Sequence, residues 1–186
     1  MKEVYVVLSD TGTWLSRLIR IYTKKRLNHA SIAFDEELIE MYSFGRKSKG
    51  NPFVGGFVRE DARKGLFKNA ECEIFKFEVS VSDYGRMRDR ILEVRNASET
   101  YSYNFLGLFG VVAQKKWERK YKFFCSQFVA TILMESKEIK LEQQPCLTTP
   151  FHLTQIEQLE CIYSGKLRDY IEPNFGEEKA NDFLAI

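Results

Sequence analysis

Apolar side chains alternate along residues 72–79, and this pattern constrains the fold more than any other in the chain. The apolar positions are Ile74, Phe75, Phe77 and Val79. Such alternation predicts a β-strand with a buried face. Residues 4–8 form a short run rich in β-branched residues, which predicts a second buried strand. The chain must therefore build a sheet and cover it.

Apolar residues at helical spacing supply that cover. Residues 82–94 predict a helix with Ser82 as its N-cap, and residues 14–22 predict another. An apolar stripe over residues 128–133 predicts a third helix, which begins at or near Cys125. The remaining expected elements are a hairpin of strands 30–34 and 38–44, a loop at 47–52, an irregular or edge strand at 53–58, a helical turn at 61–67, a short helix capped by Thr149, and a last strand at 162–171.

These elements fit one α+β domain. The chain has 186 residues, of which 44% are hydrophobic, so one sizeable core is expected and a second domain would be cramped. We therefore expect a single domain over residues 1–186, with a polar, loosely packed tail from about residue 172.

The charge balance excludes some partners. A net charge of +2 argues against a nucleic-acid binder, whose basic face usually raises the charge of the whole domain. The basic runs at residues 24–26 and 115–120 are short, and we interpret them as solvated faces, with a membrane or phosphate contact as the alternative. The oligomeric state is left open.

The N-terminus and the cysteines indicate the compartment. The first residues carry an acid early and only a five-residue apolar run, unlike a secretory signal, and no apolar run is long enough to span a bilayer. The four cysteines are Cys72, Cys125, Cys146 and Cys161. None of them forms a C-x-x-C pair, so neither a zinc site nor a redox dithiol is indicated. We expect a cytoplasmic protein with free thiols.

Cys125 is the cysteine whose position favours chemistry. A helix N-terminus carries roughly half a positive charge, which favours a thiolate, and a nearby histidine would complete the activation. The alternative is an inert buried thiol. The chain has two histidines, His29 and His152, which the residues alone rank nearly equal. Cys72 lies between Glu71 and Glu73, which disfavour its thiolate.

Two short strings resemble a known family. Residues 28–35, followed by Leu38-Ile39-Glu40, resemble the histidine hairpin of the permuted papain-like cysteine hydrolases of the NlpC-type superfamily, most closely its YiiX-like branch. Residues 125–129, Cys-Ser-Gln-Phe-Val, resemble the nucleophile string of that branch, and the order of His before Cys is the permuted one. Residues 40–46, 51–53 and 55–58 also resemble uncharacterised bacterial members, so the resemblance extends to about residue 160.

The resemblance implies an antiparallel sheet packed against helices, with the nucleophile at a helix N-terminus. It implies Cys125 as nucleophile, His29 as general base and Glu40 as the residue that orients the imidazole, with Ser43 and Tyr42 as rivals for that last role. The backbone N–H of Cys125 would be one oxyanion donor, and a second donor is not assigned. The candidates for lining the substrate pocket are Tyr5, Asp10, Thr11, Tyr42, Ser43 and Ser126.

The resulting hypothesis is a cysteine amidase or peptidase that cleaves a small amide or peptide bond through a thioester at Cys125. Such chemistry needs no metal or organic cofactor. One alternative is a lipid acyltransferase or thioesterase with the same nucleophile, in which the aromatic residues 105–109 form a lipid-facing lip; these residues could equally belong to the core. Another is a non-catalytic binding module, because a fold does not fix chemistry.

Overall fold

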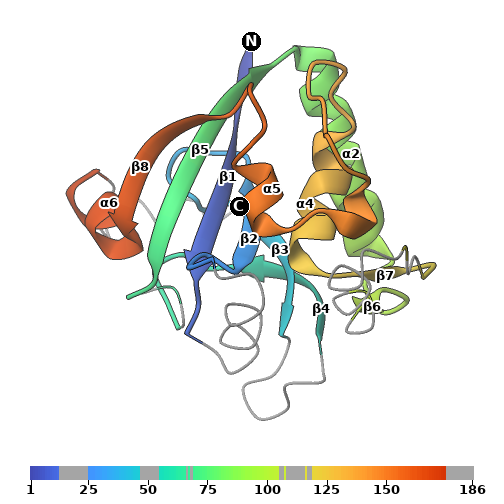
Figure 1. Cartoon of the computed structure of the whole chain (residues 1–186), viewed down its shortest axis with the longest axis horizontal. Coiled ribbons are helices and arrows are strands. Elements are labelled where there is room, and N and C mark those ends of the chain that lie inside the picture. Colours follow the sequence, from blue (N-terminus) through green and yellow to red (C-terminus); the bar gives the residue numbers. More distant parts are fainter. Residues whose placement is uncertain are drawn as a thin grey trace.

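The computed structural model describes residues 1–12, 25–46, 55–65, 67, 69–104, 107, 116 and 119–174. The fold is α+β, with a six-stranded antiparallel sheet packed against helices (Figure 1). The strands follow the order β4–β3–β2–β1–β5–β8 across the sheet. Their bounds are β1 Lys2–Asp10, β2 His29–Ala33, β3 Met41–Arg46, β4 Gly55–Glu60, β5 Glu71–Val79 and β8 Glu160–Lys166.

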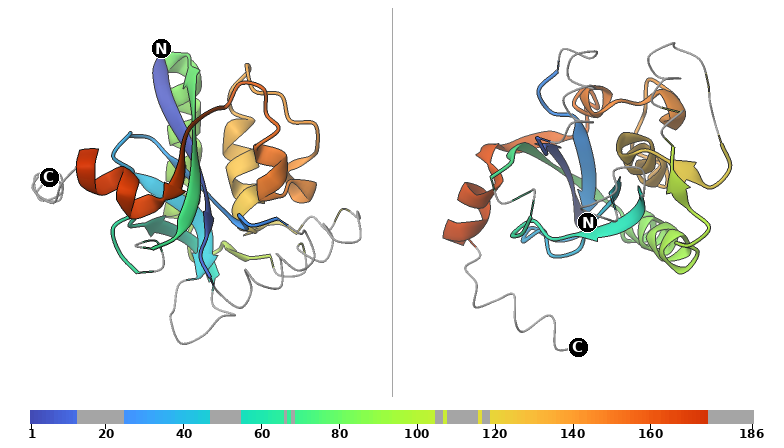
Figure 2. Two further views of the ribbon diagram at one scale, coloured as in Figure 1. Left: turned by 60° about the vertical axis from the view of Figure 1, so that its left-hand side comes forward. Right: turned by 90° about the horizontal axis from the view of Figure 1, so that it is seen from below.

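The described residues also form helices that lie beside the sheet (Figure 1). They are α2 Val81–Asn96, α4 Cys125–Leu133, α5 Pro150–Leu153, α6 Leu167–Asn174 and the 3-10 helix η1 Pro145–Leu147. Two short parallel strands, β6 Ser102–Tyr103 and β7 Lys122–Phe123, pair beside the main sheet. Figure 2 shows α4, α5 and α2 on one side of the sheet and α6 on the other.

The central strand β1 is apolar throughout because both faces of the sheet are covered. Val4, Val6 and Leu8 face a large core shared with α2 and α4. Tyr5 and Val7 face a second, smaller core closed by α6. Successive side chains on a strand point to opposite faces, so one short run supplies both cores.

Several sequence expectations are confirmed. Strands β2 and β3 form the expected antiparallel hairpin, and β4 is an edge strand of the sheet, although it begins at Gly55 and continues to Glu60. The backbone turns between Asp61 and Phe67, and Thr149 caps α5.

Two expected boundaries are wrong. Helix α2 begins earlier than predicted, because the hydroxyl of Ser80, and not that of Ser82, accepts the backbone N–H of Asp83 at 3.0 Å. The last strand ends at Lys166 and the chain continues as α6, whose Leu167 and Ile171 are buried against the second core. The loosely packed tail expected from about residue 172 does not begin there, because α6 continues to Asn174. The helix expected at residues 14–22, the loop at 47–52, the chain after Asn174 and, except for Gly107, the aromatic residues 105–109 lie outside the described residues.

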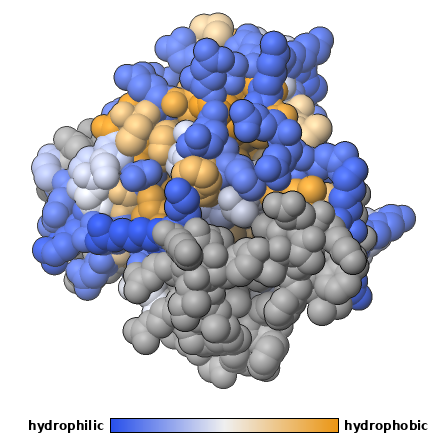
Figure 3. Space-filling view, in the orientation of Figure 1, coloured by the Kyte–Doolittle hydropathy of each residue, from blue (hydrophilic) through white to orange (hydrophobic). Residues whose placement is uncertain are grey.

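The surface in the view of Figure 1 is mainly hydrophilic over the described residues, with apolar side chains exposed between the polar ones near its centre (Figure 3). Among the described residues no helix is both long enough and apolar enough to cross a membrane.

Candidate active site

Cys125 is the first residue of α4. Phe124 precedes it in an extended conformation and provides no side-chain cap, so no side chain at this position takes up the first N–H groups of the helix. The thiol is 3% exposed. A buried sulfur beside free N–H groups at a helix N-terminus is in a position that stabilises negative charge.

His29 is the first residue of β2, and its ring has partners on three other elements: β3, β4 and α4. Nε2 lies 2.8 Å from Oε1 of Glu60 and 3.2 Å from Oγ of Ser43. The ring also hydrogen-bonds the side chain of Cys125. Because Nε2 is already occupied by Glu60, Nδ1 is the nitrogen left to accept from the thiol.

Glu60 is the last residue of β4, and its carboxylate bridges two residues of β2. Oε1 contacts His29, and Oε2 accepts a hydrogen bond from the hydroxyl of Ser31 at 2.5 Å. His29 and Ser31 are two positions apart, so they lie on the same face of the strand. The side chains of His29 and Glu60 are only 14% and 9% exposed, so this charge pair is poorly screened by water.

The surroundings shift the pKa values of His29 and Cys125 in opposite directions. Burial alone would lower the pKa of His29, but the charge of Glu60 and hydrogen bonds to Cys125 and Glu60 raise it to about 10. Burial alone would raise the pKa of Cys125, but the hydrogen bond and charge of His29, with the backbone N–H groups of Ala30 and Ser126, lower it. The arrangement therefore favours a thiolate–imidazolium pair.

Tyr103, on β6, is a further neighbour of Cys125. Its hydroxyl hydrogen-bonds the Cys125 side chain, and burial together with the charge of that sulfur raises the pKa of the phenol. The phenol thus stays protonated and can act as a donor. Gly55 lets the ring approach, because a Cβ at that position would lie 2.9 Å from Cβ of Tyr103.

Other candidates for the same chemistry lie in unfavourable surroundings. Burial, followed by the charges of Glu71 and Glu73, raises the pKa of Cys72 to about 12. Burial and Glu73 also raise the pKa of Cys161. His152 is held in a capping box, where its Nδ1 accepts the backbone N–H of Thr149 at 3.1 Å.

The sequence assigned the orienting role to Glu40, and the structure gives the contact with His29 to Glu60. The Glu40 carboxylate pairs with Arg88 of α2. The register explains the exchange, because Glu60 lies opposite Met41, the residue after Glu40. Glu40 lies just before β3 and is directed to α2, whereas Glu60, opposite Met41 on β4, lies on the face of the sheet that carries His29.

The predicted pocket residues are dispersed. Ser43 contacts His29, and the backbone of Ser126 contacts the sulfur while its hydroxyl donates to the carbonyl of Thr148 at 2.7 Å. Asp10 accepts from the side chain of Asn28, the residue before His29, at 3.2 Å, and Thr11 is half-buried just beyond β1.

For two of those candidates the described contacts are with residues other than Cys125 and His29. Tyr5 pairs with Ala33, at the end of β2 opposite to His29, and its hydroxyl donates to Glu3 at 2.6 Å. Tyr42 is 4% exposed and stacks on Phe57 in the large core. Both rings are buried: Tyr5 belongs to the second core and Tyr42 to the large core.

Three residues of the cluster were missed from the sequence: Glu60, Ser31 and Tyr103. Glu60 lies two residues beyond the edge strand expected at residues 53–58, so a longer strand prediction would have included it. Ser31 lies inside the histidine string, two positions after His29 and therefore on its face. No pattern in the sequence connects Tyr103 to Cys125.

A pocket of about 270 Å³ lies near this cluster. It is lined by Leu8, Lys25, Arg26, Leu27, Glu73, Pro150, Phe151 and Thr154. Leu8 pairs with Ala30, whose N–H faces the Cys125 sulfur, and Pro150 follows closely on Thr148, which binds Ser126. None of the lining residues belongs to the cluster of Cys125, His29 and Glu60, so the pocket borders the neighbours of the cluster and not the cluster itself.

Within the described part of the chain, no group of three or more His, Cys, Asp or Glu side chains is arranged to hold a metal ion. No family model matches the sequence, and no curated protein matches it. The interpretation of the site therefore depends on its geometry: a buried cysteine at a helix N-terminus, a histidine that bonds it, and a carboxylate that bonds the histidine.

Proposed function

We propose that this protein is a cysteine hydrolase of the permuted papain-like type, which cleaves a small amide or peptide bond through a thioester at Cys125. One observation carries the proposal: Cys125 begins α4 and hydrogen-bonds His29, whose Nε2 lies 2.8 Å from Glu60. A nucleophile, a base and a residue that orients the base are the three parts that such catalysis requires.

The first half of the reaction forms the thioester. The Cys125 thiolate attacks the carbonyl carbon, and the carbonyl π electrons move to oxygen. The backbone N–H of Cys125 and the hydroxyl of Tyr103, which already bonds the sulfur, are the donors that we assign to this oxyanion. As the intermediate collapses, the C–N bond breaks and the leaving nitrogen takes the proton from Nδ1 of His29.

The second half releases the acid. Neutral His29 takes a proton from water, the hydroxide adds to the thioester carbonyl, and the C–S bond breaks. The products are the carboxylic acid, the thiolate and the imidazolium, so the starting ion pair is restored. Glu60 stabilises the positive imidazolium and keeps hydrogen on Nε2, which leaves Nδ1 free to exchange the proton.

The nearby pocket suggests which substrates to try first. The apolar half of its lining consists of Leu8 and Pro150, which are buried, with Leu27 and Phe151; the other half is polar or charged: Lys25, Arg26, Glu73 and Thr154. A substrate side chain that reached this pocket would gain about 0.8 kcal/mol for each methylene buried against its apolar lining. We therefore expect amides of large apolar residues to be cleaved faster than the matching glycine amides.

The test is alkylation by iodoacetamide across pH, with the modified cysteine located by peptide mass spectrometry. An ordinary thiol reacts only as the pH approaches about 8.5. We expect Cys125 to react well below that pH, and Cys72 and Cys161 not to, because the pKa shifts of these residues have opposite directions.

The two histidines provide a matched pair of variants. His29→Ala should remove the reactivity of Cys125 at low pH, whereas His152→Ala, which alters only a helix cap, should leave it unchanged. If Cys125 reacts no faster than Cys72 in the unmodified protein, the hydrolase proposal is overturned and a binding module becomes the better account.

A further inference from the structure

We infer that Ser31 is a positioning residue for the proposed reaction: it holds Glu60 in the one orientation in which the carboxylate accepts from His29 and stabilises the imidazolium. The inference rests on the proposed function and extends it to a residue that never touches the nucleophile. Its basis is the short hydrogen bond, 2.5 Å, from the Ser31 hydroxyl to Oε2 of Glu60.

Glu60 needs such a hold because it acts over a distance. Strands β4 and β2 are not neighbours, and β3 lies between them. The flexible side chain of Glu60 must therefore extend across β3 to reach His29, and ordering it costs rotamer entropy. With Oε1 on His29 and Oε2 on Ser31, both carboxylate oxygens are fixed to the same strand.

Packing does not replace this hydrogen bond. Met41 of β3 lies opposite Glu60, and near the carboxylate β3 presents Gly45, where an added Cβ would lie 3.4 Å from Oε1. The contact of Ser43 is with Nε2 of His29, at 3.2 Å, and not with Oε2 of Glu60. Of these neighbours, Ser31 is the one whose hydroxyl binds the second carboxylate oxygen.

Burial makes the loss of Ser31 consequential. Ser31 is fully buried, and the Glu60 side chain is 9% exposed. Without the hydroxyl, Oε2 would be a buried charged oxygen with one donor fewer, which is costly, and the carboxylate can escape only by turning away toward solvent. His29 would then lose the charge that raises its pKa, and the thiolate of Cys125 would lose part of its stabilisation.

The experiment measures the pH dependence of Cys125 alkylation in Ser31→Ala and Ser31→Thr. We expect Ser31→Ala to move the acid limb upward by about one pH unit, which is about a tenfold slower reaction at a fixed pH on that limb. Ser31→Thr keeps a hydroxyl and should restore most of the reactivity. The matched control is Ser136→Ala, which removes another buried serine hydroxyl that binds a carboxylate, Asp83, remote from Cys125.

The outcomes separate this inference from the proposed function. An unmodified protein in which Cys125 is no more reactive than Cys72 contradicts the proposed function and the inference together. A reactive unmodified protein whose acid limb is unchanged in Ser31→Ala overturns the role of Ser31 alone. An equal shift in Ser31→Ala and Ser136→Ala would also overturn it, because the effect would then report general destabilisation.

Discussion

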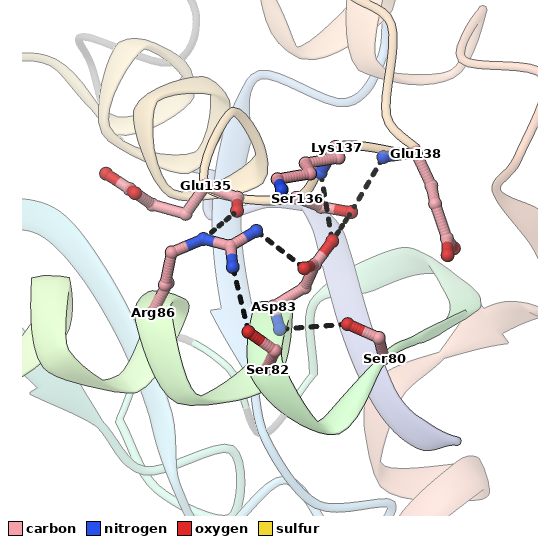
Figure 4. Close-up of polar contacts among 8 residues, drawn as sticks. All are labelled: Ser80, Ser82, Asp83, Arg86, Glu135, Ser136, Lys137 and Glu138. Carbon is pink, nitrogen blue, oxygen red and sulfur yellow. Dashed lines mark hydrogen bonds and ion pairs between the residues drawn. The ribbon is translucent and has the colours of Figure 1, made fainter.

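Helix α4 begins at Cys125 and ends at Leu133, and a buried charged cluster lies at each of these ends. At the first end, Cys125, His29 and Glu60 form a chain of three titratable groups. At the other end, Asp83 of α2 binds the turn that follows α4 (Figure 4). Both clusters contain a carboxylate in a poorly solvated place, and they use it differently.

Asp83 is saturated with donors. Its carboxylate accepts the backbone N–H of Lys137 at 2.9 Å, the hydroxyl of Ser136 at 3.1 Å and a guanidinium N–H of Arg86 at 2.5 Å. Arg86 in turn donates to the carbonyl of Glu135 at 3.0 Å (Figure 4). The backbone N–H of Lys137, then the side chains around it, lower the pKa of Asp83 to about 2. Every contact stabilises one charge state, so this cluster fixes structure.

The cluster at Cys125 stabilises a charge that can move. The thiol proton can pass to His29, because Glu60 stabilises the imidazolium that results. The raised pKa of His29 implies that the stabilisation by this pair is complete below about pH 6.5, its ordinary pKa, and is lost as the pH rises through about 10. His29 lies between a thiol and a carboxylate, so it can exchange a proton with the thiol. Asp83 accepts only from fixed donors, so it stays ionised and connects α2 to the turn after α4.

Cys125→Ser should have the largest effect on activity. Serine has nearly the same size, so the fold should persist, but its hydroxyl is far harder to ionise than a thiol. We expect turnover of a small amide to fall at least about 1,000-fold, measured as kcat/KM, with little change in Tm. Turnover that persists in this variant would place the chemistry elsewhere.

Glu60→Gln should come next. The amide keeps an oxygen acceptor for His29 but loses the charge, so the imidazolium is less stable and the acid limb of kcat/KM moves upward. We expect turnover to fall about 10- to 100-fold at neutral pH. Glu40→Gln is the matched variant: it weakens a partly exposed pair with Arg88, worth about 0–1 kcal/mol, and should leave turnover unchanged. Equal losses in both variants would contradict the assignment of Glu60.

Asp83→Asn should lower stability without changing the reactivity of Cys125. The folded protein holds the pKa of Asp83 at about 2, below the ordinary 3.8, so the stabilisation is present above about pH 3.8 and is lost as the pH falls through about 2. The Tm difference from the unmodified protein, followed by circular dichroism, should therefore shrink over that range. Asp89→Asn, at an exposed aspartate of α2, should show no such difference.

Two glycine variants should give the smallest effects and separate the site from the scaffold. Gly55→Ala places a methyl group 2.9 Å from Cβ of Tyr103, so the ring must shift, and we expect the alkylation rate of Cys125 to fall a few-fold. Gly85→Ala in α2 meets no atom within 4 Å and should raise the free energy of unfolding by up to about 1 kcal/mol. Alkylation that is faster in Gly55→Ala would contradict the role given to Tyr103.

The spacing of apolar residues predicted many of the elements, because one buried face of a strand or a helix requires apolar side chains at the period of that element. The alternation at residues 72–79 predicted β5, and the stripe after Cys125 predicted the start of α4. The last strand was predicted too long, since the apolar residues at 167–171 fit a strand run as well as the buried face of α6. Apolar composition alone does not distinguish these two.

By itself the sequence determined most strands of the sheet and that a helix begins at or near Cys125. Only the tertiary structure decided which carboxylate contacts His29. Glu40 and Glu60 are twenty positions apart, and the antiparallel register of β3 and β4 brings them almost opposite each other. Glu40, just before β3 begins, then contacts Arg88, and Glu60, at the end of β4, contacts His29. Strand order and register depend on packing across the whole sheet, so no local pattern specifies that choice.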